Sequence, residues 1–274
     1  MGVPYAELIG DPVGHSKSPV IHKFWLGKLG MEGDYRRLRL PADGLTAYFQ
    51  SRRADPDWRG CNVTIPYKRK ILPLLDGARI RATDAVNCVV PEAGRLIGYN
   101  TDTAGVGAAV DGGIDTGDPV CIVGAGGAAS AAVARLDTLA VCRFNVIVRN
   151  PAQGRALVEA YYQHGEVFAF EEACAAMRGC AALINATPLG MTGFDPMPES
   201  VLAAVAGLSK EAVVLDMVYA PLRTGLLRSA ERRGLRTVDG LTVLIGQARE
   251  AFRLFFGADA PPAHDGELRA LLTR

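Results

Sequence analysis

A glycine-rich turn between an apolar run and an alanine-rich run constrains the fold of this chain more than any other feature. The stretch VCIVGAGGAAS places Gly124, Gly126 and Gly127 directly after a strand-like segment and before a helix-like one. Glycines in such a turn let the backbone approach a pyrophosphate at the helix N-terminus, where free N–H groups and the helix dipole favour anions. Ala129 stands at the third position of the G-x-G-x-x-G pattern, which accepts alanine there. The turn therefore predicts a dinucleotide-binding α/β domain.

The end of the next predicted strand indicates which dinucleotide is bound. An NAD site carries Asp or Glu there, about twenty residues beyond the glycines, to bond the ribose 2′-hydroxyl. This chain instead has VIVRNP, with Arg149 and no acid. A guanidinium pairs with a 2′-phosphate through charge-assisted hydrogen bonds, so Arg149 favours NADP over NAD. The alternative is that Arg149 is a surface residue at the end of a strand.

Composition and charge exclude several other classes of protein. A length of 274 residues suits two domains of ordinary size, and 49% hydrophobic with 22% charged residues is typical of folded globular proteins. A net charge of +1 provides no general field for nucleic acid or a membrane surface. The cysteines at 61, 88, 121, 142, 174 and 180 form no CxxC pair and no zinc-like cluster, so we expect thiols in a reducing cytoplasm and no metal site. The N-terminus lacks a signal-peptide pattern, which also favours a cytoplasmic protein.

Two series of strand and helix patterns follow one another along the chain. In the first, strands are expected near 6–11, 34–40 and 60–65, helices near 18–30, 43–53 and 68–76, the last interrupted by Pro73, and a hairpin over 85–100 that turns at 92–94. In the second, strands are expected near 120–124, 144–150, 181–188 and 212–219, and helices near 126–138, 154–165 and 241–257. Alternating strands and helices predict two α/β domains with parallel, doubly covered sheets, joined near residue 103. The last helix is expected to return to the first domain, because its inward polar residue Gln247 suits a cleft.

Polar side chains recur in the first series where strands and turns alone do not require them. GDPVGHSKSPVIH offers Ser16 and Ser18, and NVTIPYK offers Thr64 and Lys68. An alternative for Ser18 is an N-cap, with the following proline at the first helical position, but this leaves Ser16 without a role. Asn87 and Asp102 follow further on, with structural alternatives as a turn residue and a helix cap.

These motifs together resemble the shikimate dehydrogenase family, over nearly the whole chain and in order. The matching stretches are HSKSPVIH, NVTIPYK, DAVN, GYNTD, GAGGAA, NATPLGM, DMVYAPLRT and a final helix with GQAREAF. The resemblance implies an N-terminal, mainly parallel α/β substrate-binding and catalytic domain over 1–103 and 242–274, and a Rossmann NADP-binding domain over 104–241. It also implies reversible, NADPH-dependent reduction of 3-dehydroshikimate to shikimate, in the biosynthesis of aromatic amino acids.

The resemblance assigns roles to individual residues of this chain. Lys68 and Asp102 correspond to the catalytic pair. The substrate carboxylate and ring hydroxyls would be bound by Ser16, Ser18, Thr64, Asn87, Tyr219 and Gln247. The cofactor would be bound by Gly124, Ala125, Gly126, Gly127, Ala128, Arg149, Asn185, Thr187, Met191 and Gly240.

The chemistry of ketone reduction agrees with these roles. Hydride addition makes an alkoxide, which needs a nearby positive charge and then a proton, and the ammonium of Lys68 supplies both. Asp102 nearby would keep Lys68 charged, while a closed cleft would lower its pKa. Hydroxyls and amides suit a polyol, because a site that bonds each hydroxyl rejects analogues that lack one.

The chain departs from the family pattern at a few positions. Cys88 follows Asn87 where threonine is common, and Val243 stands where a methionine often packs on the nicotinamide. VRNPAQGR is a loose version of the family's cofactor segment, with Gln153 where a second basic residue often lies and Arg155 as its possible substitute.

Two other functions are compatible with parts of the pattern. One is a quinate/shikimate dehydrogenase with broader substrate or NAD use, against which Arg149 argues. The other is a metabolite sensor without turnover, which predicts loss of Lys68 or Asp102, yet both are present. We expect small-molecule partners, no nucleic acid or membrane partner, and a monomer or homodimer.

Overall fold

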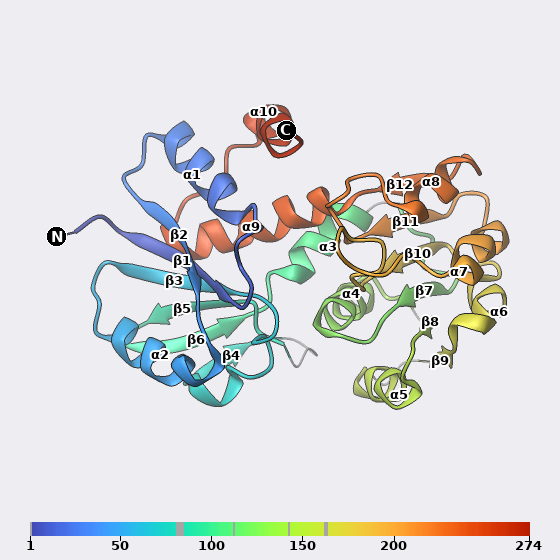
Figure 1. The fold of residues 1–274 in the computed structure, drawn as a ribbon, viewed down its shortest axis with the longest axis horizontal. Helices are drawn as coiled ribbons and strands as arrows, with labels where there is room; N and C mark the ends of the chain where they lie inside the picture. The colour runs from blue at the N-terminus through green and yellow to red at the C-terminus, as the bar shows by residue number, and fades with distance from the viewer. Residues whose placement is uncertain (1, 81–84, 112, 142, 162–163) are drawn as a thin grey trace. The chain divides into compact units, whose positions relative to one another are not determined.

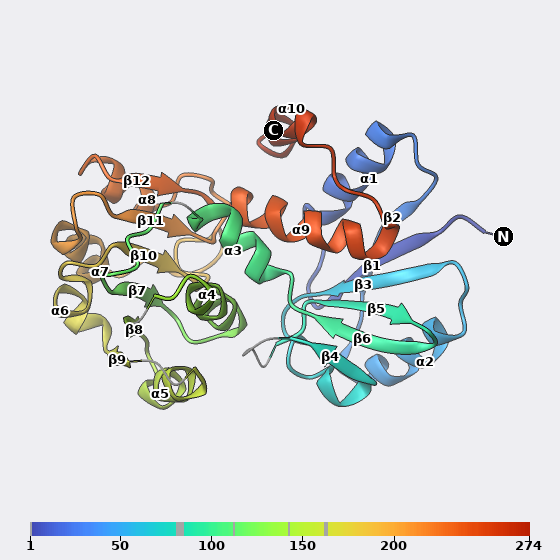
Figure 2. The ribbon, with the colours of Figure 1, turned by 180° about the vertical axis from the view of Figure 1, so that it is seen from behind.

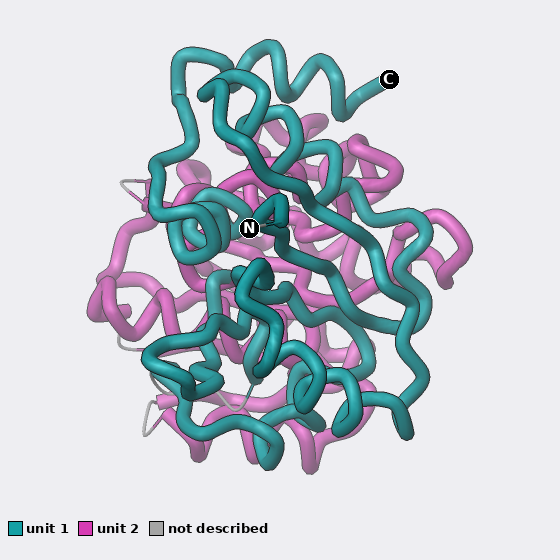
Figure 3. Tube along the Cα trace, turned by 90° about the vertical axis from the view of Figure 1, so that its left-hand side faces the viewer, with its two compact units in different colours: residues 1–101, 247–274 teal, residues 102–246 magenta. Residues whose placement is uncertain are grey.

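The computed structural model describes residues 2–80, 85–111, 113–141, 143–161 and 164–274. These form two compact units, which Figure 3 distinguishes by colour. Unit 1 comprises residues 1–101 and 247–274, and unit 2 comprises residues 102–246. The boundaries predicted from the sequence, after 103 and before 242, differ from these by two and five residues.

Unit 1 contains a mixed six-stranded sheet in the order β2-β1-β3-β5-β6-β4 (Figure 1). Its strands are β1 (Tyr5–Gly10), β2 (Asp34–Arg39), β3 (Trp58–Val63), β4 (Gly77–Arg79), β5 (Cys88–Glu92) and β6 (Arg95–Tyr99). β1 pairs in parallel with β2 and β3, and β6 with β4, whereas β5 is antiparallel to both of its neighbours. The predicted hairpin is thus the β5–β6 pair.

The helices of unit 1 cover both faces of this sheet. They are α1 (Ser18–Leu29), η1 (Ala42–Gly44), α2 (Leu45–Arg53), η2 (Leu72–Leu74), η5 (Pro262–His264), α10 (Asp265–Leu272) and the second half of α9 (Gly240–Phe256). Side chains alternate along β1, so Tyr5 and Ile9 join the core beneath α2, while Ala6 and Leu8 join the core beneath α9.

The helix predicted over residues 68–76 is wrong. The chain there makes a series of turns, in which the N–H of Tyr67 donates to the carbonyl of Thr64 and that of Leu74 to Ile71, and only η2 is helical. Pro73 lacks an N–H donor and clashes with the preceding turn of an α-helix, which limits the helical stretch to three residues.

Unit 2 contains six strands that all pair in parallel, in the order β12-β11-β10-β7-β8-β9. They are β7 (Val120–Val123), β8 (Arg143–Ile147), β9 (His164–Phe168), β10 (Ala182–Asn185), β11 (Val213–Asp216) and β12 (Arg236–Val238). The central strands are fully buried, as expected where helices cover both faces. The prediction of two α/β parts, one of them a Rossmann-type domain with a parallel sheet, is confirmed.

The two faces of the unit 2 sheet have separate cores. α3 (Asp102–Val110), α4 (Gly127–Thr138) and α5 (Pro151–Ala160) pack on the face that receives Val120 and Ile122. η3 (Phe170–Glu172), α6 (Ala173–Met177), α7 (Glu199–Ala204), η4 (Val205–Gly207) and α8 (Gly225–Glu231) lie on the side that receives Cys121 and Val123. Figure 2 shows α4 and α3 from the opposite side to Figure 1.

The helix predicted over 154–165 differs from the structure at both ends. α5 begins earlier because Asn150 caps it, accepting a hydrogen bond from the N–H of Ala152 at 3.0 Å, with Pro151 in the first turn. It ends at Ala160, and His164 already belongs to β9; residues 162–163 lie outside the described residues.

Two further observations concern the whole described chain. None of its helices is both long and apolar enough to cross a membrane. Within the described residues no disulfide is present, and Cys142 lies outside them.

Candidate active site

The two predicted carboxylate-binding serines lie together at the start of α1. The hydroxyl of Ser16 donates to that of Ser18 at 3.2 Å and accepts the backbone N–H of Ser18 at 3.2 Å. The N-cap of α1 is Lys17, and no side chain caps this helix. The alternative in which Ser18 is an N-cap is therefore wrong, and both hydroxyls remain candidates for binding an anion. The Arg37 guanidinium donates to the carbonyl of Ser16 and fixes the loop from the side of β2.

Lys68 follows β3 through a turn that is held at several points. The N–H of Thr64 donates to the carbonyl of Ile9 at 3.0 Å, and the carbonyl of Thr64 accepts the N–H of Tyr67 at 3.0 Å. The Tyr67 hydroxyl donates to the carbonyl of Leu40 at 2.6 Å. Finally, the carbonyl of Lys68 accepts the N–H of Val86 at 2.8 Å. The backbone that presents Thr64 and Lys68 is thus tied to three other segments of unit 1, while both residues remain partly exposed.

Asn87 and Gln247 meet in a buried polar cluster in unit 1. The Asn87 side chain accepts the N–H of Thr101 at 2.7 Å and donates to its hydroxyl at 3.0 Å. The Thr101 hydroxyl also lies 3.4 Å from Oε1 of Gln247. All three residues are nearly inaccessible to solvent. Sequence reasoning missed Thr101, whose only signal was its place beside Asp102 in the GYNTD motif.

Asp102 is the first residue of α3 and belongs to unit 2, whereas Lys68 belongs to unit 1. The pairing of these two side chains therefore stays a prediction. The acid lies in the first turn of its helix, where a carboxylate interacts favourably with the helix dipole. Position in a first turn does not conflict with a catalytic role.

The glycine-rich turn joins β7 to α4 as the sequence predicts. Gly124 has φ of +106°, a conformation that residues with a Cβ rarely adopt, and its N–H donates to the carbonyl of Ile147 at 2.8 Å. Gly126 is the N-cap of α4, so no side chain caps this helix, and Gly127 is its first residue. Gly126 is exposed and its neighbours Ala125 to Ala128 are partly exposed. The turn can therefore present backbone N–H groups to an anion.

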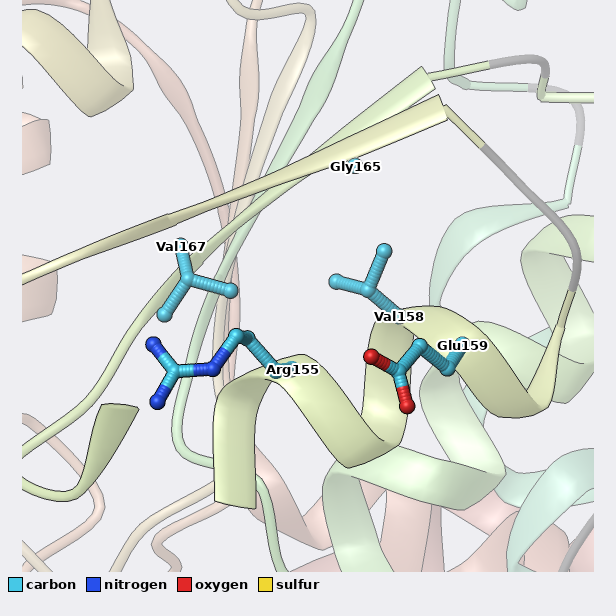
Figure 4. A pocket seen from close by; sticks show the side chains of 5 residues that line it. All are labelled: Arg155, Val158, Glu159, Gly165 and Val167. Atoms are coloured by element: carbon cyan, nitrogen blue, oxygen red, sulfur yellow. The ribbon is translucent and has the colours of Figure 1, made fainter. Parts of the chain in front are cut away.

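Arg149 lies two residues beyond the end of β8 and is exposed, next to the buried Val148. Its position agrees with binding a 2′-phosphate and equally with the alternative of a surface arginine. Arg155 lies on α5 and lines a shallow groove of about 300 Å³ against β9, with Val158, Glu159, Gly165 and Val167 (Figure 4). The side chain of Arg155 extends toward Val167 in this groove, whose other lining residues are not predicted to bind the cofactor.

The remaining predicted residues of unit 2 follow the ends of β10 and β11. Thr187, Met191 and Tyr219 are partly exposed, whereas Asn185 is fully buried. Gly240 begins α9, and a Cβ there would lie 2.4 Å from the carbonyl oxygen of Met217. Only glycine therefore lets α9 start this close to the loop after β11.

Comparison with known proteins identifies the family. Residues 8–89 match the family model described as the shikimate dehydrogenase substrate binding domain. A shikimate dehydrogenase (NADP(+)) of Sphingopyxis alaskensis is 48% identical over 272 residues, which cover 98% of this chain and 97% of the relative. The chain belongs to the shikimate dehydrogenase family.

Solved structures of the family extend the likeness to the fold. The shikimate 5-dehydrogenase of Thermus thermophilus, in complex with NADP(H) and shikimate, has a TM-score of 0.83 at 32% identity, covering 98% of this chain and 99% of that one. A quinate dehydrogenase of Corynebacterium glutamicum, in complex with NAD, has a TM-score of 0.83 at 29% identity with the same coverage. The predictions of an NADP-dependent oxidoreductase that interconverts 3-dehydroshikimate and shikimate, in aromatic amino-acid biosynthesis, are confirmed by these relationships.

Proposed function

We propose that this chain reduces 3-dehydroshikimate with NADPH using the residues that its motifs assign, with unit 1 binding the substrate and unit 2 the cofactor. The observation that carries the proposal is 48% identity with an NADP-dependent shikimate dehydrogenase over 98% of the chain. The local geometry within each unit supports parts of it.

Unit 1 offers the polar groups that a carboxylated polyol requires. The paired hydroxyls of Ser16 and Ser18 would bind the carboxylate, and Thr64, Asn87 and Gln247 the ring hydroxyls. Asn87 and Gln247 are joined through Thr101, so their amides are already oriented before substrate binds. Preorganised polar groups of this kind discriminate strongly against analogues that lack a hydroxyl, because the groups would be left unpaired. Tyr219, in unit 2, would contact the substrate from the cofactor side.

Lys68 would act on the carbonyl that is reduced. When bound, NADPH supplies the hydride. The ammonium of Lys68 would stabilise the negative charge that develops on the carbonyl oxygen and then transfer a proton to it. Asp102 would act as the second member of the catalytic pair that the motifs assign.

The cofactor would lie along the carboxyl edge of the unit 2 sheet. N–H groups of the glycine-rich turn, from Ala125 to Ala128, would bind the pyrophosphate, with Gly124 shaping the turn, and Arg149 would bind the 2′-phosphate. Thr187, Met191 and Gly240 would line the nicotinamide half. The residues fit this group, because the turn lies at the N-terminus of α4 and Gly126, its N-cap, is exposed.

A second candidate function is a quinate/shikimate dehydrogenase with broader substrate or NAD use. The likeness to a quinate dehydrogenase in complex with NAD favours considering it, and the exposed Arg149 argues against NAD. The net charge of +1 supports small-molecule partners rather than nucleic acid. We also propose a cytoplasmic protein that is a monomer or homodimer.

Steady-state kinetics tests these alternatives together. Oxidation of NADPH and NADH is followed with 3-dehydroshikimate, and reduction of NADP⁺ and NAD⁺ with shikimate and with quinate. The proposal requires the highest kcat/KM for NADPH with 3-dehydroshikimate. Comparable quinate oxidation with NAD⁺ would favour the second candidate, and binding without turnover in any combination would favour a metabolite sensor.

A further inference from the structure

A buried carboxylate at the carboxyl edge of the unit 2 sheet has no part in the predicted site. Asp216 ends β11 and is fully buried. Its Oδ1 accepts hydrogen bonds from Nδ2 of Asn185 at 2.8 Å and from the N–H of Val218 at 3.0 Å. Its Oδ2 accepts from the hydroxyl of Thr224 at 2.6 Å. Burial raises the pKa of the Asp216 carboxyl, while these three hydrogen bonds from neutral donors oppose the rise.

The carboxylate fixes the orientation of the neighbouring amide. An ionised carboxylate can only accept hydrogen bonds, so the amide nitrogen of Asn185 must face Asp216 and its oxygen must face the other way. That oxygen accepts the N–H of Thr187 at 3.0 Å and its hydroxyl at 2.6 Å. The side chain of Thr187 is therefore held in one orientation by a residue that Asp216 orients.

Thr187 in turn lies against the glycine-rich turn. A Cβ built on Gly124 would lie 2.7 Å from Cγ2 of Thr187 and 3.3 Å from the carbonyl oxygen of Ala186. β11, β10 and β7 are neighbours in the sheet, and Asp216, Thr187 and Gly124 lie at or just beyond their carboxyl ends. One chain of contacts thus links the ends of three adjacent strands, the edge where parallel α/β sheets bind their ligands.

The other oxygen of Asp216 holds the loop after β11. The Thr224 hydroxyl that donates to Asp216 also accepts the N–H of Leu227 at 3.2 Å and caps α8. The loop between Asp216 and Thr224 contains Tyr219, and its Met217 carbonyl lies directly against the start of α9 at Gly240. The same carboxylate therefore anchors the loop after β10, which carries Thr187, through Asn185, and the loop after β11, which carries Tyr219 and packs against Gly240.

We infer that Asp216 is a positioning residue for the cofactor, which orients Asn185 and through it sets Thr187 against the glycine-rich turn. The inference rests on the proposed cofactor site. It also assigns Asn185 a supporting role, because its amide nitrogen donates to both Asp216 and the carbonyl of Leu189, and its oxygen accepts two hydrogen bonds from Thr187. A fully buried carboxylate costs free energy unless hydrogen bonds compensate it, so a purely structural role is the alternative to test.

The variant Asn185→Asp breaks the link while keeping the shape of the side chain. It places a second carboxylate against Oδ1 of Asp216, and two facing carboxylates share a proton at low pH and repel each other when both are ionised. The Kd for NADPH, measured by its fluorescence, should rise about tenfold or more, the change expected for a lost hydrogen bond to a charged group. The loss should grow between pH 6 and pH 9 relative to the unchanged protein, and the Kd for shikimate should not change.

The double variant Asn185→Asp/Asp216→Asn provides the rescue. The amide at 216 can donate to the carboxylate at 185 and accept from Thr224, although its NH2 group then also faces the N–H of Val218. Part of the NADPH affinity should therefore return, and the added pH dependence should disappear because only one carboxylate remains. Asp216→Asn alone should have a smaller effect than Asn185→Asp. If Asn185→Asp gives no folded protein, Thr224→Val should weaken NADPH binding and Thr224→Ser should not.

Several results would overturn the inference. One is an Asn185→Asp protein with a lowered Tm but unchanged NADPH affinity, and another is an Asn185→Asp protein that loses NADPH and shikimate affinity equally. The others are a double variant that binds NADPH no better than Asn185→Asp, and a Thr224→Val protein that binds NADPH as tightly as Thr224→Ser. Binding is measured without turnover, so a failure of Lys68 or Asp102 as catalytic residues is distinguishable. Such a failure would abolish the predicted effect of Lys68 on kcat and leave the NADPH comparison intact.

Discussion

A buried histidine predicts how the stability of unit 1 depends on pH. His22, on α1, is fully buried and stacks on Tyr35, with ring centroids 4.1 Å apart and 6° between the planes. Its ring also packs edge-on against Trp25 and at a tilt against Phe252. In the part of the chain that the structure describes, neither ring nitrogen has a hydrogen-bond partner. Burial among these rings lowers the pKa of His22 from 6.5 to about 3.

The size of the effect follows from proton linkage. Above pH 6.5 the histidine is neutral in both states and its pKa shift costs nothing. Between pH 6.5 and 3 the unfolded chain binds a proton that the folded unit does not, so the free energy of unfolding falls by about 1.4 kcal/mol per pH unit. At pH 5 the loss is therefore about 2 kcal/mol relative to pH 7.5, and this value holds for any folded-state pKa well below 5.

The variant His22→Phe isolates this contribution, because phenylalanine has a similar shape and cannot be protonated. Urea unfolding is followed by tryptophan fluorescence at pH 7.5, 6.5, 5.5 and 5; both tryptophans, Trp25 and Trp58, belong to unit 1 and report on it. Other groups titrate equally in both proteins, so the difference between them measures His22. The midpoint of the unchanged protein should fall by roughly 1 M urea more than that of the variant between pH 7.5 and 5. Parallel curves for the two proteins would refute the reasoning.

Three further substitutions test the site and the core. Lys68→Ala should lower kcat about 100-fold or more with little change in shikimate binding, whereas the nearby exposed Lys70→Ala should not; near-normal turnover of Lys68→Ala would remove it from the chemistry. Arg149→Ala should raise the KM for NADPH about tenfold and leave that for NADH nearly unchanged, and equal effects would mean that the 2′-phosphate is bound elsewhere. Arg52→Met leaves the buried carboxylate of Glu7, now paired at 2.7 Å, without its cation and should cost about 3–5 kcal/mol in urea unfolding. A loss below about 1 kcal/mol would show that Glu7 is accommodated without Arg52.

The longer strands and helices were largely predictable from the sequence, whereas the short elements were not: β4, β9, β12, α6, α7, α8 and α10. Strands of unit 2 are short apolar runs separated by helix-length segments, and this pattern permits few arrangements other than a parallel sheet. The helix predicted over 68–76 is wrong because Pro73 limits the helical stretch to η2. The helix predicted over 154–165 overlaps the start of β9, an edge strand whose alternating exposure gives only a weak apolar pattern. Edge strands bury fewer apolar side chains than central strands, so their sequences show a weaker apolar pattern.

The candidate substrate residues were predictable where polar groups interrupt apolar segments. Ser16 and Ser18 stood out because a helix cap explains only one of two hydroxyls. Thr101 was not predictable in this way, because its role is to hydrogen-bond Asn87. Asn87 lies 14 positions earlier in the sequence, and the β5–β6 hairpin brings the two residues together. A hydroxyl in a loop has many ordinary roles, and only its partner distinguishes them.

Burial separates the residues of a motif into those that face a ligand and those that support them, and the sequence alone does not. NATPLGM contains Asn185 and Thr187 two positions apart, yet the first is fully buried and the second partly exposed. The partner that explains Asn185 is Asp216, 31 positions later, and a complete crossover between parallel strands lies between them. Because parallel strands place their carboxyl ends side by side whatever the length of that crossover, a single acid can orient groups from both loops. The affinity for the cofactor then depends on an acid with no expected contact to it, which the Asn185→Asp and Asp216→Asn pair measures directly.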